Sequence, residues 1–191
     1  MAGALAQAVV IGASAGGPAA LRRLLERLDP GLPAAVVVVN HVGARGPDLL
    51  PEVLGQSCAL PVALAQERMP VTQGRVHVAP SGYHLLIEPD RHFSLSVDPK
   101  VCFSRPSIDV LFETAARAYH KCLIGVVLTG ASSDGAEGLA QIRQRGGLAL
   151  VQSPEEAEVP TMPRAALERA GADLCAPLDA LAVRINAAVR P

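Results

Sequence analysis

The sequence predicts an α/β fold, a three-layer α/β/α sandwich on a mostly parallel, doubly wound sheet with an inserted β-hairpin. Short aliphatic runs alternate with segments of helical periodicity along the chain. Half of the residues are hydrophobic and only 3% are aromatic, so the core is expected to consist of Val, Leu, Ile and Ala, as around buried parallel strands. The 191 residues suit one compact domain over 1–191 with a sizeable core.

The expected elements follow from these patterns in chain order. Apolar β-branched runs predict buried strands, and Gly, Pro and Asn residues separate them from the helices. Strands are expected over 8–11, 35–39, 62–65, 76–80, 123–128 and 148–152, and the hairpin over 83–88 and 92–97. Helices are expected from residue 19, and over 48–55, 108–120 (with Ser107 as N-cap), 136–145, 164–170 and 178–189.

Composition and charge argue against several classes of protein. The formal net charge is −1 and there is no basic run, so nucleic-acid binding is not expected. The sequence shows no signal-peptide pattern and no apolar run of membrane-spanning length, which predicts a cytoplasmic protein without membrane insertion. The four cysteines lack metal-site or CxxC spacing and are expected to be reduced thiols: Cys58, Cys102, Cys122 and Cys175. No metal or other cofactor is expected.

The first candidate for chemistry is the turn that follows the first predicted strand. The strand ends at Gly12, and Ser14 follows in the pattern Gly12-Ala13-Ser14-Ala15-Gly16 before a helix begins. This pattern matches G-x-S-x-G, in which a serine on a strand-to-helix turn acts as a nucleophile. Serine is also a preferred helix N-cap, so the motif alone leaves both roles of Ser14 open.

Two more polar residues follow predicted strands. His41 ends the second strand, and Asp134 lies in the loop after the strand over 123–128. Because ligands of open parallel sheets bind at the carboxyl ends of the strands, these side chains are expected to converge with Ser14. In such a triad His41 takes the Ser14 proton, Asp134 orients the imidazole, and the Ala15 N–H meets the oxyanion. Singly, each has an ordinary alternative: a solvated strand end for His41, and a turn or N-cap for Asp134.

Two other enzyme or binding classes fit the same motifs less well. The turn resembles a dinucleotide-binding loop, but Ser14 stands at its middle glycine position, and Asn40 and His41 replace the acid expected after the second strand. The order serine, histidine, aspartate also differs from the serine, acid, histidine order of α/β-hydrolases. The other histidines lack a comparable placement and are expected to be structural: His77, His84, His92 and His120.

Five segments in a fixed order carry a resemblance to a known family. They are Val10–Gly17, Asn40-His41, Ala79–Leu85, Arg105–Phe112 and Gly125–Gly138. Together they resemble the catalytic domain of the chemotaxis protein-glutamate methylesterases (CheB), in register from about residue 8 to residue 167. The resemblance implies a three-layer α/β/α sandwich, in agreement with the fold class predicted above.

The resemblance also implies an activity and its residues. It implies a serine esterase that hydrolyses γ-glutamyl methyl esters of methyl-accepting chemotaxis receptors, releases methanol and, in many members, deamidates receptor glutamines. The family's nucleophile, histidine and aspartate fall on Ser14, His41 and Asp134, which the strand ends also select. The implied partner is such a receptor or a related signalling protein. Members with a regulatory half carry an N-terminal receiver domain, and here that control is expected to be either absent or supplied by a separate receiver-domain regulator.

The sequence departs from the family pattern close to these residues. Ala15 stands where a threonine commonly follows the serine, and Ala131 stands at the methionine of Gly-Met-Gly-x-Asp-Gly. Residues 40–43 read Asn-His-Val-Gly instead of Gln-His-Met-Pro, and 160–163 read Pro-Thr-Met-Pro instead of Tyr-Gly-Met-Pro. Ala15, Ala131 and Met162 are therefore expected to form the oxyanion and substrate rim. The alternative function is a weakly active or inactive CheB-like module that binds a receptor or signalling partner.

Overall fold

The centre of the molecule is a seven-stranded sheet in the order β3-β4-β2-β1-β7-β8-β9. The computed structural model describes residues 5–41 and 48–190, and all neighbouring strands of this sheet run parallel. The strands are β1 (Ala8–Ala13), β2 (Ala35–Asn40), β3 (Val62–Leu64), β4 (Val76–Val78), β7 (Leu123–Val127), β8 (Leu148–Gln152) and β9 (Leu174–Ala176). The mostly parallel α/β fold predicted from the sequence is confirmed.

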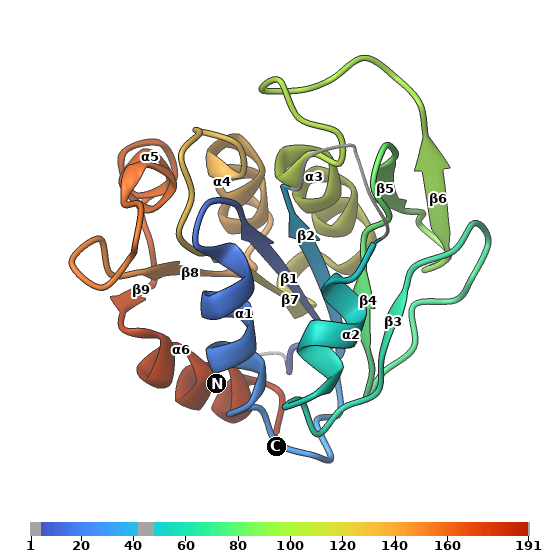
Figure 1. Ribbon diagram of the computed structural model, residues 1–191, viewed down its shortest axis with the longest axis horizontal. Coiled ribbons are helices and arrows are strands. Elements are labelled where there is room, and N and C mark those ends of the chain that lie inside the picture. The colour runs from blue at the N-terminus through green and yellow to red at the C-terminus, as the bar shows by residue number, and fades with distance from the viewer. Residues whose placement is uncertain (1–4, 42–47, 191) are drawn as a thin grey trace.

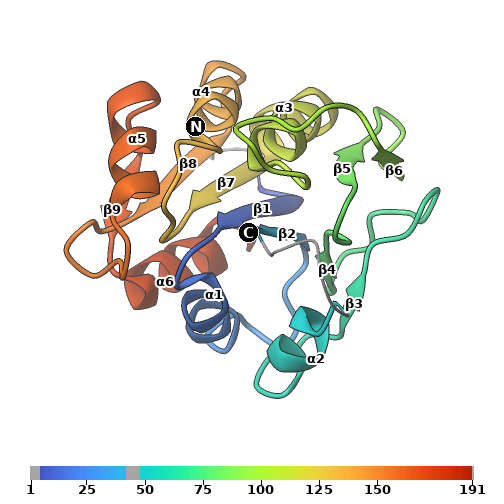
Figure 2. The same cartoon turned by 45° about the horizontal axis from the view of Figure 1, so that its top comes forward.

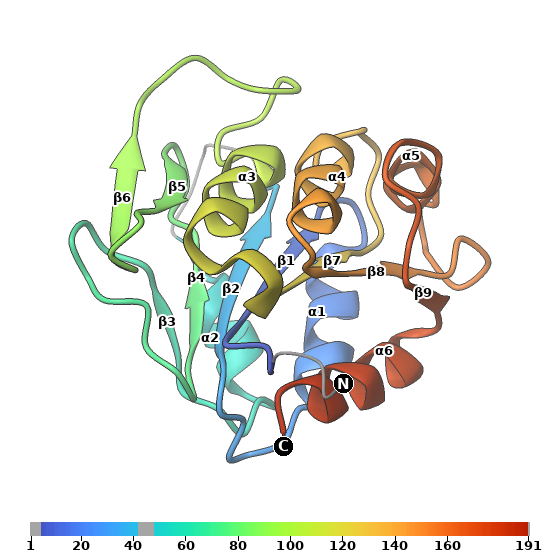
Figure 3. The same cartoon turned by 180° about the vertical axis from the view of Figure 1, so that it is seen from behind.

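Helices cover both faces of the sheet (Figures 1 and 3). One face carries α1 (Gly17–Leu25), α2 (Leu50–Gly55) and α6 (Leu178–Ala188), and the other carries α3 (Ile108–Tyr119), α4 (Ala136–Gln144) and α5 (Thr161–Arg169). A short 3₁₀ turn (His120–Cys122) joins α3 to β7. Among the described residues, none of the helices combines the length and the apolar character needed to cross a membrane.

The two cores follow from the alternation of side chains along the strands. In β1, Val9 and Ile11 belong to the core that contains α1 and α6, whereas Ala8 and Val10 belong to the core under α3. All six residues of β1 are buried, because a strand covered on both faces has no polar side. The aliphatic composition of the chain is thus explained by a central sheet that is buried on both sides.

The inserted hairpin forms a small sheet of its own beside α3 (Figure 2). Its strands, β5 (His84–Ile87) and β6 (Phe93–Ser96), pair antiparallel, within the ranges predicted from the sequence. The Ile87 N–H donates to the Thr114 hydroxyl of α3 at 3.2 Å. The hairpin is therefore tied to the helix that begins at the candidate site.

Some element boundaries differ from the prediction. The edge strand β9 was not predicted, because three residues before Pro177 are too short to show an alternating pattern. Helix α5 begins at Thr161 rather than at residue 164, since Pro163 lies in its first turn, where a proline is tolerated. Val42 and Gly43, at which the sequence departs from the family pattern, lie outside the described residues.

The strand order determines where a site can form. After β1 the chain first forms β2, β3 and β4 on one side of β1, and later β7, β8 and β9 on the other side. The carboxyl ends of β2, β1 and β7 are therefore neighbours at the point where the winding direction reverses, which is the usual place for a ligand site in such sheets. Ser14 follows β1, His41 follows β2, and Asp134 lies in the loop after β7.

Candidate active site

Ser14 lies on a sharp turn between β1 and α1. Its N–H donates to the Thr129 carbonyl at 3.0 Å, and its own carbonyl accepts from the Gly17 N–H at 2.7 Å. Gly16 is the N-cap residue with a φ of 75°, a left-handed conformation that glycine adopts without steric strain. The Ser14 side chain does not cap the helix, and Ser14 is only partly buried, so its hydroxyl is free for another role.

The loop between β7 and α4, which contains Gly130, lies directly against this turn (Figure 1). A Cβ atom on Gly130 would be 2.8 Å from the Ser14 Cβ and 2.0 Å from the Met162 Sδ. Met162, 1% exposed, is thus packed behind Gly130, whereas Ala15 and Ala131 are exposed. Of the three predicted rim residues, Ala15 and Ala131 are exposed to solvent, whereas the Met162 side chain is buried behind Gly130.

Thr129 holds the Ala15–Gly16 peptide group of the turn. Its hydroxyl donates to the Ala15 carbonyl at 2.9 Å and accepts from the Val159 N–H at 2.9 Å. The Thr129 N–H in turn donates to the buried Gln152 side chain at 2.9 Å. Over residues 5–41 and 48–190, no group accepts a hydrogen bond from the Ala15 N–H, so this donor is available to a ligand.

His41 is held at the end of β2 by its backbone and by its ring. The His41 N–H donates to the Ala13 carbonyl at 3.0 Å, and its Nε2 lies 2.7 Å from the Asp134 Oδ2. The preceding Asn40 is 5% exposed and packs so closely on α1 that a Cβ on Gly17 would be 1.9 Å from its Oδ1. In the part of the chain that the structure describes, no hydrogen bond joins the Ser14 hydroxyl to the His41 ring.

The Asp134 carboxylate is buried and accepts four hydrogen bonds. Its Oδ1 accepts from the Ser107 hydroxyl and the Asp109 N–H, each at 2.9 Å, and its Oδ2 accepts from the Ile108 N–H and from His41, each at 2.7 Å. Burial alone would raise the pKa of Asp134, but the His41 hydrogen bond and the N–H groups at the start of α3 hold this pKa below its ordinary value. Asp134 is therefore an anion that fixes the Nε2–H tautomer of His41.

A second carboxyl group, that of Asp109, lies beside Asp134. Its Oδ1 accepts from the Gly135 N–H at 2.9 Å and from the Gly138 N–H at 2.7 Å. Burial and the neighbouring charge of Asp134 raise the pKa of Asp109 to about 7, although the N–H donors oppose the shift. The site thus contains one carboxylate that stays charged and one carboxyl group that keeps its proton up to about neutral pH.

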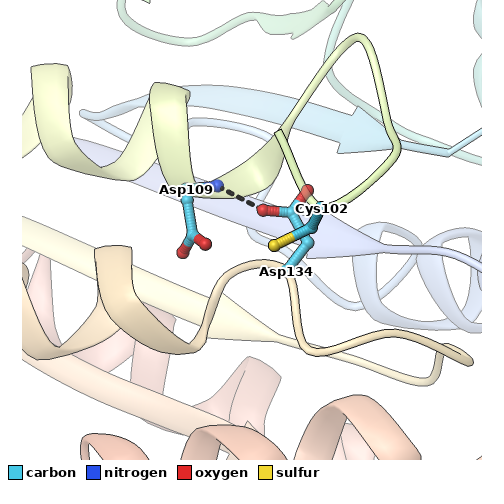
Figure 4. Close-up of side chains that lie close together, drawn as sticks. All are labelled: Cys102, Asp109 and Asp134. Carbon is cyan, nitrogen blue, oxygen red and sulfur yellow. Dashed lines mark hydrogen bonds between the residues drawn. The ribbon is translucent and has the colours of Figure 1, made fainter. Parts of the chain in front are cut away.

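Cys102 completes a cluster with these two acids (Figure 4). Potential ligand atoms of Cys102, Asp109 and Asp134 lie within 4.8 Å of one another. All four hydrogen-bonding positions of Asp134 are already used by donors of the chain, so the arrangement is better suited to helix capping than to metal binding. Beside the cluster is a cavity of about 560 Å³, lined by Cys102, Asp109, Ser133, Ala136, Glu137, Ala165, Glu168 and Arg169.

The sequence did not reveal the supporting roles of three residues in the site: Ser107, Thr129 and Asp109. Ser107 is the predicted N-cap of α3, and its hydroxyl accepts from the Val110 N–H, but its hydrogen bond to Asp134 was not foreseen. Thr129 and Asp109 were not foreseen at all, because their partners lie far away in the chain. His84, expected to be structural, is buried, accepts from the Ser107 N–H at 3.2 Å and lies 3.0 Å from the Pro99 carbonyl.

Comparison with known proteins places the chain in a family. The family model described as CheB methylesterase matches residues 9–185. A protein of Leptospira interrogans is 47% identical over 176 residues, which cover 92% of this chain and 91% of the relative. The protein-glutamate methylesterase/protein-glutamine glutaminase of Symbiobacterium thermophilum is 38% identical, with 95% of this chain and 50% of the relative covered. This chain therefore spans about half the length of that relative.

A solved structure of a CheB methylesterase catalytic domain has the same fold. The crystal structure of the Thermotoga maritima CheB methylesterase catalytic domain superposes with a TM-score of 0.89 at 29% sequence identity. The match covers 96% of this chain and 99% of that one, so both the central sheet and its helices correspond. The chain described here belongs to the CheB methylesterase family.

Proposed function

We propose that this protein is a serine esterase that hydrolyses glutamate γ-methyl esters on methyl-accepting chemotaxis receptors. In this proposal Ser14, His41 and Asp134 are its catalytic triad. The observation that carries the proposal is the 2.7 Å contact between His41 Nε2 and a buried Asp134 carboxylate, at the strand ends next to Ser14. Family membership supports the reaction class, and the names of relatives support both the methylesterase and the glutaminase activity.

The tautomer of His41 determines how the triad works. Because Asp134 holds the proton of His41 on Nε2, the nitrogen left to accept the Ser14 proton is Nδ1. Ser14 Oγ then attacks the ester carbonyl, and methanol leaves with the proton returned by His41. Water adds to the acyl-enzyme with His41 again as base, which releases the glutamate and restores Ser14. The same steps deamidate a glutamine, with ammonia as the leaving group.

The turn itself supplies the oxyanion site in this proposal. The Ala15 N–H has no acceptor within the described residues, and it lies at the N-terminal end of α1, where the helix dipole favours negative charge. In this proposal exposed Ala131 belongs to the substrate rim, and buried Met162 supports the rim from behind Gly130. The chemistry needs no metal or cofactor.

The partner in this proposal is a receptor or related signalling protein that presents a methylated glutamate. The chain spans about half the length of several named relatives. We propose that a receiver-domain protein is among its regulatory partners. The whole chain 1–191 is proposed to be one catalytic domain of the CheB type.

A fluorophosphonate probe together with a methanol-release assay tests the triad. Wild type is expected to be labelled at Ser14 and to release methanol from methylated receptor, and S14A and H41A are expected to lose both activities. Ser153 also follows a strand, β8, so S153A is the matched control and is expected to keep both. If S14A were labelled as wild type is, the triad would be wrong. If folded wild type bound the receptor without releasing methanol, the non-enzymatic binding module would be favoured.

A further inference from the structure

The starts of α3 and α4 are capped by each other's carboxyl groups. Asp134 directly precedes the N-cap of α4, yet its carboxylate accepts from the Ile108 and Asp109 N–H groups at the start of α3. Asp109 lies in the first turn of α3, yet its carboxyl group accepts from the Gly135 and Gly138 N–H groups of α4. The first N–H groups of a helix lack partners within the helix and favour negative charge. The carboxyl group at the start of each helix thus accepts hydrogen bonds from N–H groups at the start of the other helix.

This exchange depends on the close approach of the two helices, which lie side by side in Figures 1 and 3. A Cβ on Gly138 would be 2.5 Å from the Phe112 Cβ and 3.1 Å from the Asp109 Cα. Ile108 packs equally tightly, since a Cβ on Gly12 would be 2.4 Å from its side chain and a Cβ on Gly135 2.8 Å. The backbone that carries Asp134 therefore has little freedom while Asp109 holds Gly135.

We propose that Asp109 is a positioning residue for the triad: its carboxyl group fixes the backbone on both sides of the α4 start, and thereby fixes the Asp134 oxygen that orients His41. The Asp109 backbone N–H adds a direct hydrogen bond to Asp134 at 2.9 Å, drawn in Figure 4. This inference rests on the proposed function, because a positioned His41 matters only if His41 acts on Ser14.

The charge of Asp109 gives the proposal a signature in pH. The groups that face it are Asp134 and Cys102 in the cluster, and Glu137, Glu168 and Arg169 around the adjoining cavity. The raised pKa of Asp109, about 7, means that it is neutral at pH 5 and mostly charged at pH 8. When charged, it places a second negative charge beside Asp134, the acid that holds the His41 ring.

Two variants at this position separate its hydrogen bonds from its charge. D109A removes the acceptor, and kcat for methanol release is expected to fall about 10- to 100-fold with KM within about twofold. D109N keeps an amide oxygen for the Gly135 and Gly138 N–H groups, so its kcat at pH 6 is expected to lie within about threefold of wild type. Because the side-chain amide of D109N cannot become charged, its pH–rate profile is expected to lose the part of the wild-type profile that follows the titration of Asp109 near pH 7.

Control measurements distinguish a loss of folding from a displacement of the Asp134 carboxylate. All rates are divided by the folded fraction from circular dichroism. E113Q, which removes an exposed carboxylate of α3 outside this cavity, is expected to leave kcat and the pH profile unchanged. A D109A enzyme with wild-type kcat would overturn the proposal, as would a D109N enzyme as slow as D109A at pH 6. Should D109A not fold, a D109N profile that coincides with wild type would overturn it. Activity retained by S14A would instead refute the proposed function, whatever the Asp109 variants do.

Discussion

The turn that carries Ser14 is shaped by the absence of side chains around it. Gly130 leaves room for both Ser14 and Met162, and Gly17 leaves room for Asn40. Interiors are packed so closely that even one added methyl group must displace a neighbour. The hydroxyl of Ser14 is thus positioned by neighbours that are small, in addition to the hydrogen bonds on its backbone.

At the residue scale, we expect G130A to damage both stability and labelling. The added Cβ would lie 2.0 Å from Met162 Sδ and 2.8 Å from Ser14 Cβ, and overpacking of this kind costs about 1–3 kcal/mol. Urea unfolding and the rate of fluorophosphonate labelling measure the two effects. Gly31 has no atom within 4 Å of an added Cβ, so G31A is the control. Equal behaviour of the two variants would show that the turn tolerates a shift of Ser14.

Sequence reasoning reached the candidate triad but not its supports. Ser14, His41 and Asp134 could be selected because each combines a reactive residue type with the end of a strand, and strand ends meet in a parallel sheet. Asp109 gave no such signal, because an aspartate in the first turn of a helix normally caps its own helix. Its role arises only when α4 approaches α3 at Gly138, a contact that no local pattern encodes.

At the scale of elements, the segment between β6 and α3 contains an unusual turn. Val101 and Ser104 exchange backbone hydrogen bonds of 3.1 and 2.9 Å, and the two residues between them, Cys102 and Phe103, have φ values of 47° and 63°. Two-residue hairpin turns with positive φ at both positions favour Asn-Gly, because other residues are strained there. Phe103 is also 94% exposed, so it gains little from packing.

We expect F103G to stabilise the protein in spite of the greater freedom of glycine in the unfolded chain. Left-handed backbone costs a non-glycine residue about 1–2 kcal/mol, and glycine loses about 0.5–1 kcal/mol more in entropy on folding, so the net gain is about 0.5–1 kcal/mol. Val97, also exposed and without a positive φ, provides the control, and V97G is expected to lower stability. Chemical unfolding measures both; a loss in F103G equal to that in V97G would contradict the strain argument.

The elements that the sequence predicted well are those with a long, regular pattern. Helix α3 has an apolar face and a serine N-cap, and its predicted and observed ranges agree within one residue at the C-terminal end. The edge strand β9 was missed because three residues at the rim of a sheet are specified by pairing with β8, not by their own periodicity. Element boundaries next to proline, as at α5, depend on whether the proline falls in the first turn.

At the scale of the whole molecule, stability resides in two aliphatic layers and very little in charge. The described ion pairs apart from that of His41 mostly join exposed side chains, as do Arg117 and Glu113 on α3, and such pairs contribute at most about 1 kcal/mol each. The core between the sheet and α1 and α6 is made largely of fully buried Leu, Ile and Val residues. The scarcity of aromatic residues in the composition is compensated by the burial of both sheet faces.

Two β-branched residues of α6 test this distribution. Ile185 is 0% exposed and Val183 is 69% exposed, although they lie two positions apart on one helix. I185A is expected to lower the free energy of unfolding by about 2–5 kcal/mol, because it removes buried methyl groups and leaves a cavity. V183A is expected to change it by less than about 0.5 kcal/mol. Comparable urea midpoints for the two variants would mean that α6 is not part of the stabilising core.

The exchanged carboxyl groups of α3 and α4 also have a kinetic consequence. Helix ends normally fray independently, because the first turn of each helix loses only its own contacts when it opens. Here the opening of either start removes the acceptor from the N–H groups of the other, and it exposes both Asp109 and Asp134. The two starts must therefore open together in one rarer event, and that keeps the Asp134 oxygen in place between openings.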